Sequence, residues 1–329
     1  MEEKLLLNQE AATSRNVKIN IYHFLDKFGI FLVLIGMIVI MSILTPFFFT
    51  VGNLLDIVRQ VSIVGITAIG ATIVIITAGI DLSPGSVIGV ASVSSALFAQ
   101  SHEPVILPII VGIVVGALAG IINGVVITKG KMAPFIVTLA MMTAARGLAL
   151  LVSGGEPIQA LSQTFGVIGG GYLAGIPIPI IIFLIIGVIF HIILTKTKIG
   201  KWIYAIGGNE QAAIIGGLNV DRIKIIVYSL AGLLAGVASV ILTSRVGSGD
   251  PNAGLGYELD AITAAVIGGT SLTGGIGTIP GTIVGALIIG VMNNGLDLLN
   301  VPSYWQSILK GVIIALAVFI DSQRHKKKS

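Results

Sequence analysis

The chain has no cysteine and few charged residues. Asp, Glu, Lys and Arg together make up 10% of its 329 residues, whereas soluble domains carry roughly 25%. The lack of thiols excludes disulfides, thiolate metal sites and a cysteine nucleophile. The four histidines are scattered without ligand spacing, so no metal site is expected: His23, His102, His191 and His325.

What fills the chain instead is apolar sequence. Hydrophobic residues account for 55% of the chain and the mean hydropathy is +1.03. A soluble fold of this composition would have no polar coat to face water, but a bilayer removes that requirement because lipid surrounds the outer surface. The composition therefore predicts a polytopic membrane protein in contact with membrane lipid.

Ten apolar segments are candidates for membrane-spanning helices, which need about 20 residues each. We therefore expect an all-α fold with one transmembrane domain over residues 29–321. The eighth segment is short, which favours a broken or re-entrant helix buried in protein or lining a cavity. The segments are 29–49, 54–78, 84–101, 104–128, 135–152, 177–195, 223–243, 260–271, 278–297 and 303–320.

The positions of Lys and Arg predict the orientation. Cytoplasmic segments of membrane proteins carry an excess of these residues, and ten spans with both termini in the cytoplasm place most of the 19 on that side. The first 28 residues are too long and too acidic for a signal peptide and are interpreted as a cytoplasmic tail. The basic tail 322–329 is interpreted as a topology anchor, because nucleic-acid binding is a poor alternative. The residues placed inside are Lys4, Arg15, Lys18, Lys27, Lys129, Lys131, Lys196, Lys198, Lys201, Arg222, Lys224, Arg324, Lys326, Lys327 and Lys328.

Many of the 43 glycines recur four residues apart within apolar segments. Small residues at this spacing let helix backbones approach closely. One interpretation is helix packing within a single subunit, and the other is a seam between two copies or a sliding surface. The runs are Gly112, Gly116, Gly120 and Gly124; Gly277, Gly281 and Gly285; and Gly232 with Gly236.

Two short motifs recur and hint at an internal repeat. Residues 79–85 (GIDLSPG) resemble 269–275 (GTSLTGG), and 116–118 with 123–124 resemble 285–287 with 294–295. Repeats are common in transporters. The two pairs have different offsets, however, and chance similarity in glycine-rich apolar sequence explains them equally well.

Catalytic motifs are missing from the apolar segments. The chain has no G-x-S-x-G, no H-E-x-x-H and no G-x-x-x-x-G-K-[ST] phosphate loop, since Gly200-Lys201 is followed by Trp202. An enzyme acting on lipids is therefore disfavoured. The chain itself is expected to bind no cofactor, and any ATP hydrolysis must come from a separate subunit.

Most acidic residues lie near the ends of the expected spans, and only Arg146 and Lys310 lie deeper. Ion-coupled carriers place ionisable groups in mid-membrane, so this scarcity argues against a secondary carrier. A pathway with few fixed charges suits a neutral solute rich in hydroxyl groups. Each candidate pathway residue could equally form an interhelical hydrogen bond: Gln60, Asp81, Ser83, Asn123, Asn293 and Asn294.

The segment 196–222 is cytoplasmic by the charge pattern and yet partly apolar. Gly207-Gly208-Asn209 can end one segment, and Asn209 can cap a short helix that begins at Glu210. The carboxylate of Glu210 would then lie at the positive end of that helix. Such a helix is either a docking element for the groove of a partner or a surface helix without a function.

Several long motifs, in order from about Pro46 to Asp321, resemble the permease subunits of bacterial ribose-type ABC importers. They are TAGIDLSPGS at 77–86, YAIGGNE at 204–210, VDRIKIIVYSLAGLL at 220–234, the 254–275 stretch and MNNGL at 292–296. The motifs favour ribose, while related members carry xylose, galactose or the autoinducer-2 signal.

The resemblance implies an inner-membrane permease that forms a homodimer and works by alternating access. It also implies a cytoplasmic ATPase, which binds ATP and Mg²⁺, and an extracytoplasmic sugar-binding protein. The residues that the resemblance places against the ATPase are Gly207, Gly208, Asn209, Glu210 and Ala212.

Overall fold

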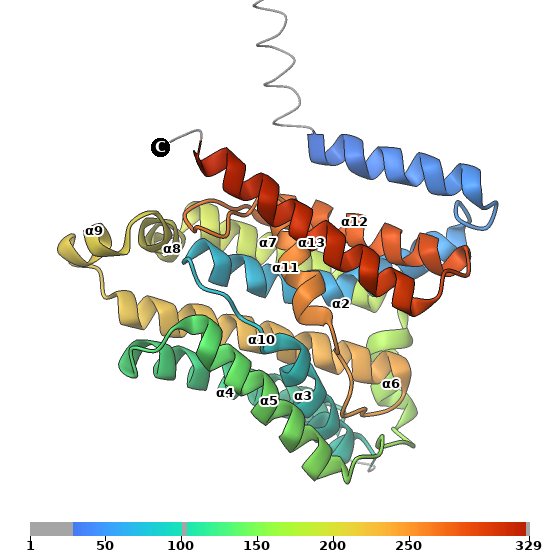
Figure 1. Cartoon of the computed structure of the whole chain (residues 1–329). Coiled ribbons are helices and arrows are strands. Elements are labelled where there is room, and N and C mark those ends of the chain that lie inside the picture. The colour runs from blue at the N-terminus through green and yellow to red at the C-terminus, as the bar shows by residue number, and fades with distance from the viewer. Residues whose placement is uncertain (1–28, 101–103, 327–329) are drawn as a thin grey trace, which may run out of the picture.

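The computed structural model describes residues 29–100 and 104–326 and is almost entirely helical (Figure 1). The predicted tail 1–28 lies outside the described residues, as do residues 327–329 and the side chains of the rest of the basic tail. After a first helix, Gly29–Leu44, the long helices are α2 (Val51–Ile76), α3 (Pro84–Ala99), α4 (Ile106–Lys129), α5 (Pro134–Ser153), α7 (Ile178–Lys196), α10 (Val220–Val246), α12 (Ile279–Leu298) and α13 (Ser303–Lys326). The shorter ones are α6 (Gln163–Gly170), α8 (Lys198–Gly208), α9 (Glu210–Ile215) and α11 (Tyr257–Ile267).

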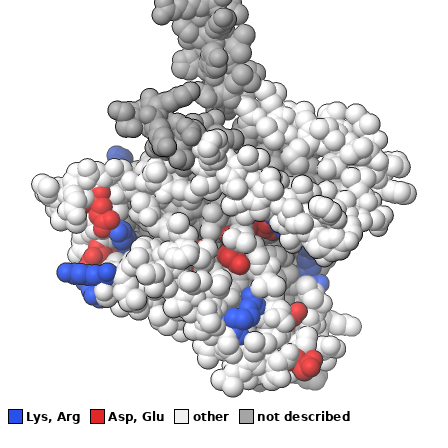
Figure 2. Space-filling model, in the orientation of Figure 1, with Lys and Arg blue, Asp and Glu red and all other residues white. Residues whose placement is uncertain are grey.

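Each of the ten expected segments contains a helix, and six helices of the described ranges are long and apolar enough to cross a membrane: α2, α4, α5, α7, α10 and α12. The first helix and α3 are apolar but shorter. A multi-pass membrane protein is thus confirmed, while the count of ten spans stays a prediction. Figure 2 shows a surface that is largely free of charge, as a lipid-facing surface requires.

One small hairpin corrects the all-α prediction. Strands β1 (Tyr172–Leu173) and β2 (Ile176–Pro177) pair antiparallel. The two residues between them, Ala174 and Gly175, have φ angles of 51° and 80°. Positive φ at both central positions is what a two-residue hairpin turn needs. The local turn chemistry therefore produces a hairpin within a segment that the apolar pattern left unassigned.

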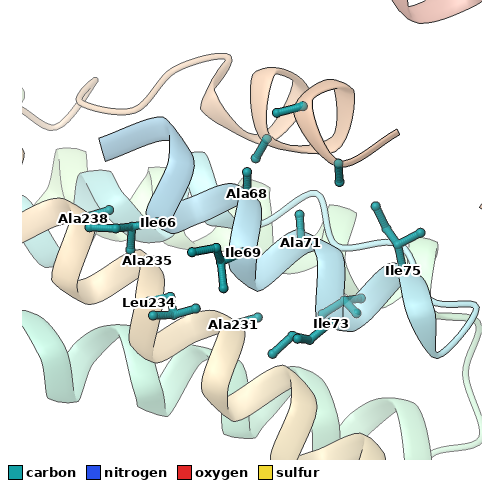
Figure 3. Packing of buried hydrophobic residues seen from close by; sticks show 14 of the residues in the cluster. Ile66, Ala68, Ile69, Ala71, Ile73, Ile75, Ala231, Leu234, Ala235 and Ala238 are labelled. Carbon is teal, nitrogen blue, oxygen red and sulfur yellow. The ribbon is translucent and has the colours of Figure 1, made fainter. Parts of the chain in front are cut away.

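Helix α2 is the centre of the molecule. Every residue from Val61 to Ile76 is buried, as expected of a helix that is apolar all round. Figure 3 shows how Ile66, Ile69 and Ile73 of α2 meet the small and branched residues of α10, among them Ala231 and Leu234. Helices α7, α11 and α12 pack on its other sides.

The glycine runs pack helices within this one chain. Gly116 of α4 faces Gly236 of α10, and a Cβ added at Gly116 would lie 2.7 Å from the Gly236 Cα. In the same way, Gly285 of α12 lies against Ala264 of α11. The first interpretation of these runs is confirmed for both helix pairs, because their small faces are already covered.

Two helix pairs are interrupted by irregular segments that lie against each other. Residues 77–83 join α2 to α3, and residues 268–278 join α11 to α12. The Gly275 amide donates to the Ile76 carbonyl at 2.9 Å. Pro84 and Pro280 stand in the first turns of α3 and α12, where proline is tolerated.

The irregular segments 77–83 and 268–278 contain most of the first pair of similar motifs. The second pair lies on α4 and α12, which have different neighbours, so an internal repeat stays a hypothesis.

Candidate functional site

One end of the molecule carries α8 and α9, which project at the left of Figure 1. The side chain of Thr197 caps α8 by accepting a hydrogen bond from the Gly200 amide at 3.2 Å. Ile203 and Ile206 of α8 are buried, whereas Lys201, on the opposite face of the helix, is exposed. The helix is therefore anchored on one face and free on the other.

Helix α9 begins as the sequence predicts. The Asn209 side chain accepts a hydrogen bond from the Ala212 amide at 2.9 Å, which caps the helix. Both carboxylate oxygens of Glu210 lie 2.8 Å from the Lys224 ammonium of α10. At the tip, Ile215 is 86% exposed. The result is a short helix fixed at its start that presents an apolar side chain at its end.

The two glycines of the predicted coupling element differ in their surroundings. Both belong to the last turn of α8. A Cβ at Gly207 would collide with the backbone of Ile76 and Gly275, whereas one at Gly208 would meet nothing within 4 Å. The pair is thus not a free hinge. Gly207 allows close backbone contact of α8 with the end of α2 and with the irregular segment 268–278, and Gly208 lies on the open side.

Basic residues gather at this same end. Lys129 at the end of α4 pairs with Asp221 in the first turn of α10 at 2.9 Å. Lys131 follows α4, Lys196 ends α7 and Arg222 lies in the first turn of α10. Blue and red side chains meet at the left of Figure 2. Several described Lys and Arg residues that the charge pattern assigns to one side of the membrane therefore lie at the end of the fold that carries α8 and α9.

Three candidate pathway residues form one buried network. Asp81 accepts hydrogen bonds from the amide and hydroxyl of Ser83 at 2.9 and 2.6 Å, and the Asn123 amide donates to the Ser83 hydroxyl at 3.0 Å. All three residues are at most 4% exposed. The network links α4 to the irregular segment 77–83, and the Asn123 side-chain oxygen is buried without a partner among the described residues.

Asn294 is also an interhelical link. Its side-chain amide and that of Asn53 in α2 exchange two hydrogen bonds, at 3.0 and 2.8 Å. This reciprocal pair ties α12 to α2 and uses both amides. Of the two interpretations of the polar candidates, Asn123 and Asn294 therefore fit the one in which they form hydrogen bonds that join helices and the segments beside them.

Gln60 and Asn293, by contrast, line a pocket of about 150 Å³ between α2, α11, α12 and α13. Lys310 of α13 pairs there with Asp260 of α11 at 3.0 Å. The sequence placed Asp260 near a span end, but its side chain is only 9% exposed. The remaining lining residues are Val61, Val64, Leu255, Tyr257, Ala286, Ile289, Gly290, Asp297 and Gln306.

Arg146 of α5 is paired internally. Its guanidinium donates hydrogen bonds to the backbone carbonyls of Pro251, Ala253 and Gly85. It thereby joins α5 to the start of α3 and to the segment before α11. These contacts give Arg146 a structural role within the chain.

The sequence missed the residues that join distant helices. Tyr204 donates a hydrogen bond to the Gly277 carbonyl at 2.7 Å, and no pattern in the neighbouring sequence predicts that contact. Asp260 and Lys310 carried a usable signal, because two opposite charges in apolar segments are expected to pair.

Comparisons with known proteins agree with this architecture. A family model described as "Branched-chain amino acid transport system / permease component" matches residues 53–318. The chain is 50% identical to the ribose import permease protein RbsC of Bacillus subtilis (strain 168) over 91% of this chain and 94% of that protein. It is 44% identical to RbsC of Escherichia coli (strain K12), over 88% and 92%. The xylose transport system permease protein XylH of Haemophilus influenzae is 34% identical, over 91% and 97%. No solved structure matches the chain.

Proposed function

Since this chain belongs to the family of branched-chain amino acid transport system / permease components, we propose that it is the membrane subunit of a bacterial ATP-driven ribose importer. The observation that carries the proposal is the identity of 44–50% to ribose import permeases over most of the chain, against 34% to a xylose permease. The pairing of polar residues within apolar helices suits a neutral solute.

The chain is a transport subunit, and ATP binding and hydrolysis belong to a separate ATPase. Helices α8 and α9 are the surface that meets this partner, through the segment that holds Gly207, Gly208, Asn209, Glu210 and Ala212. The exposed Ile215 and the free face of α8 supply the apolar and basic sides of that surface. Gly207 of α8 lies against Ile76 and Gly275, and Tyr204 of α8 bonds Gly277. These contacts would transmit a displacement of α8 to α2 and α12.

The basic end of the molecule faces the cytoplasm, in keeping with the excess of Lys and Arg on that side of membrane proteins. Both termini are then cytoplasmic, and the opposite end faces an extracytoplasmic sugar-binding protein. The membrane is the bacterial inner membrane. Two copies form a homodimer, and ATP shifts them between outward-open and inward-open states by binding one state more tightly.

The experiment that tests this function is uptake of labelled ribose by cells that express the chain with a ribose-class ATPase and binding protein. Competition with unlabelled ribose, xylose, galactose and autoinducer-2 ranks the solutes. Strong competition by ribose alone is expected. Uptake of another of these solutes with no uptake of ribose would retain the importer class and reject ribose.

A further inference from the structure

The pocket between α2, α11, α12 and α13 lies far from the proposed ATPase surface. These helices run beside one another (Figure 1) and pack in the pairs α2–α11, α2–α12, α11–α12 and α11–α13. Gln60, which lines the pocket, precedes Ile76 at the α8 end by sixteen residues, or roughly 24 Å of helix. The pocket therefore lies in the half of the fold that faces the binding protein in the proposed orientation.

One amide side chain in this pocket has unused hydrogen-bonding capacity. Asn293 is 9% exposed, and its side-chain oxygen is buried without a partner among the described residues. Its neighbour Asn294 shows the contrast, because that amide is fully engaged with Asn53. A buried polar atom without a partner is unfavourable, so we expect a ligand or water to bind Asn293 in the pocket.

The other lining groups define the chemistry of that ligand. The Lys310 ammonium pairs with Asp260, and the Asp297 carboxylate accepts a hydrogen bond from the neutral Gln306 amide at 2.8 Å. The lining therefore holds two carboxylates against one ammonium, which disfavours an anion and offers acceptor oxygens to hydroxyl groups. Tyr257 and Ile289 add aromatic and aliphatic surface. A few polar groups on an apolar lining are typical of a site for a small neutral molecule.

The size is also that of a small polyol. The volume of about 150 Å³ equals that of about five waters at roughly 30 Å³ each. A monosaccharide offers hydroxyl groups to the amides and carboxylates, and carbon-bound hydrogens to Tyr257 and Ile289.

We propose that this pocket binds one monosaccharide within each copy of the chain, with Asn293 as a hydrogen-bonding ligand and Gln60 in the pocket wall. The proposal rests on the sugar-importer function above and adds a defined place for the solute. It puts a sugar-binding site inside the helix bundle of a single chain, separate from any cavity between two copies.

The test uses the absence of native cysteine. A Gln60→Cys variant of the permease–ATPase complex in membrane vesicles is labelled with a small neutral thiol reagent, with and without excess ribose. We expect ribose to slow labelling at least threefold. Glu156→Cys, in an exposed segment outside the pocket, is the control and should label at the same rate in both conditions. Adding Asn293→Leu to Gln60→Cys should abolish the protection, because the apolar side chain removes one ligand.

Ribose uptake is measured in the same vesicles, loaded with ATP, with binding protein added. If uptake occurs and ribose does not protect Gln60→Cys, or if this cysteine does not label at all, the pocket is overturned while the importer function stands. If ribose is not taken up but another monosaccharide protects Gln60→Cys, the pocket stands and the ribose assignment fails.

Discussion

The hydroxyl of Tyr204 in α8 donates a hydrogen bond to the backbone carbonyl of Gly277, 2.7 Å away. Gly277 immediately precedes Thr278, the cap of α12. Burial raises the pKa of Tyr204 above its ordinary value, so the hydroxyl stays protonated and remains a donor at neutral pH. Since α12 also carries Asn293, this contact links the proposed ATPase surface to the helix that lines the pocket.

Removing that hydroxyl should weaken coupling more than folding. Tyr204→Phe deletes one hydrogen bond, worth about 1 kcal/mol, and leaves the ring in place. We expect the ratio of ribose transported to ATP hydrolysed to fall severalfold while ATPase activity persists. Tyr172→Phe is the matched control, because it removes a hydroxyl that bonds Arg59 outside α8. An unchanged ratio in Tyr204→Phe would contradict a role for this contact.

Adjacent glycines provide a second matched pair. In Gly207→Ala the new Cβ would lie 2.5 Å from the Gly275 nitrogen and 2.9 Å from the Ile76 carbonyl carbon. Overpacking of this kind costs about 1–3 kcal/mol, so the Tm of the purified chain should fall. Gly208→Ala should leave the Tm unchanged, since nothing lies within 4 Å. Equal Tm values for the two variants would show that α8 does not pack as described.

The ion pair between Glu210 and Lys224 can be tested by charge reversal. The Glu210 side chain is 45% exposed. Exposed ion pairs contribute about 0–1 kcal/mol to the free energy of unfolding, so single variants should fold normally. If the pair serves to position α9, Glu210→Lys should reduce ATP-dependent uptake and Glu210→Lys with Lys224→Glu should restore it. A double variant as inactive as the single one would indicate that Glu210 contacts the partner directly.

Packing of α4 on α10 predicts a strong effect at Gly116. A Cβ there would lie 2.7 Å from the Gly236 Cα and nitrogen, so Gly116→Ala should lower the Tm and the yield of folded protein. Gly36→Ala in the first helix is the control, because a Cβ at Gly36 meets nothing within 4 Å. If Gly116→Ala is as stable as the unmodified chain, the glycine face of α4 does not pack against α10 as described.

The sequence predicts the helices well because local signals determine them. The length of each apolar segment predicted where the central part of a helix lies. The capping side chain of Asn209 predicted the start of α9. The end of α11 was less predictable. The expected segment ran to residue 271, but the helix ends at Ile267, because the segment that follows bonds to a distant partner, as Gly275 does to Ile76.

The candidate site was predicted only in part for the same reason. Residue type alone selected Gln60 and Asn293 together with Asn123 and Asn294, and it could not separate an amide with a partner from one without. That separation depends on long-range neighbours, such as Asn53 opposite Asn294.

The most direct test of the central claim is ribose uptake by proteoliposomes that contain the purified chain and its ATPase, with ATP inside and binding protein outside. Each preparation is compared with one in which the ATPase binds ATP but cannot hydrolyse it. The account predicts ribose accumulation with the active ATPase and none with the inactive one. Equal uptake in both would contradict an ATP-driven importer.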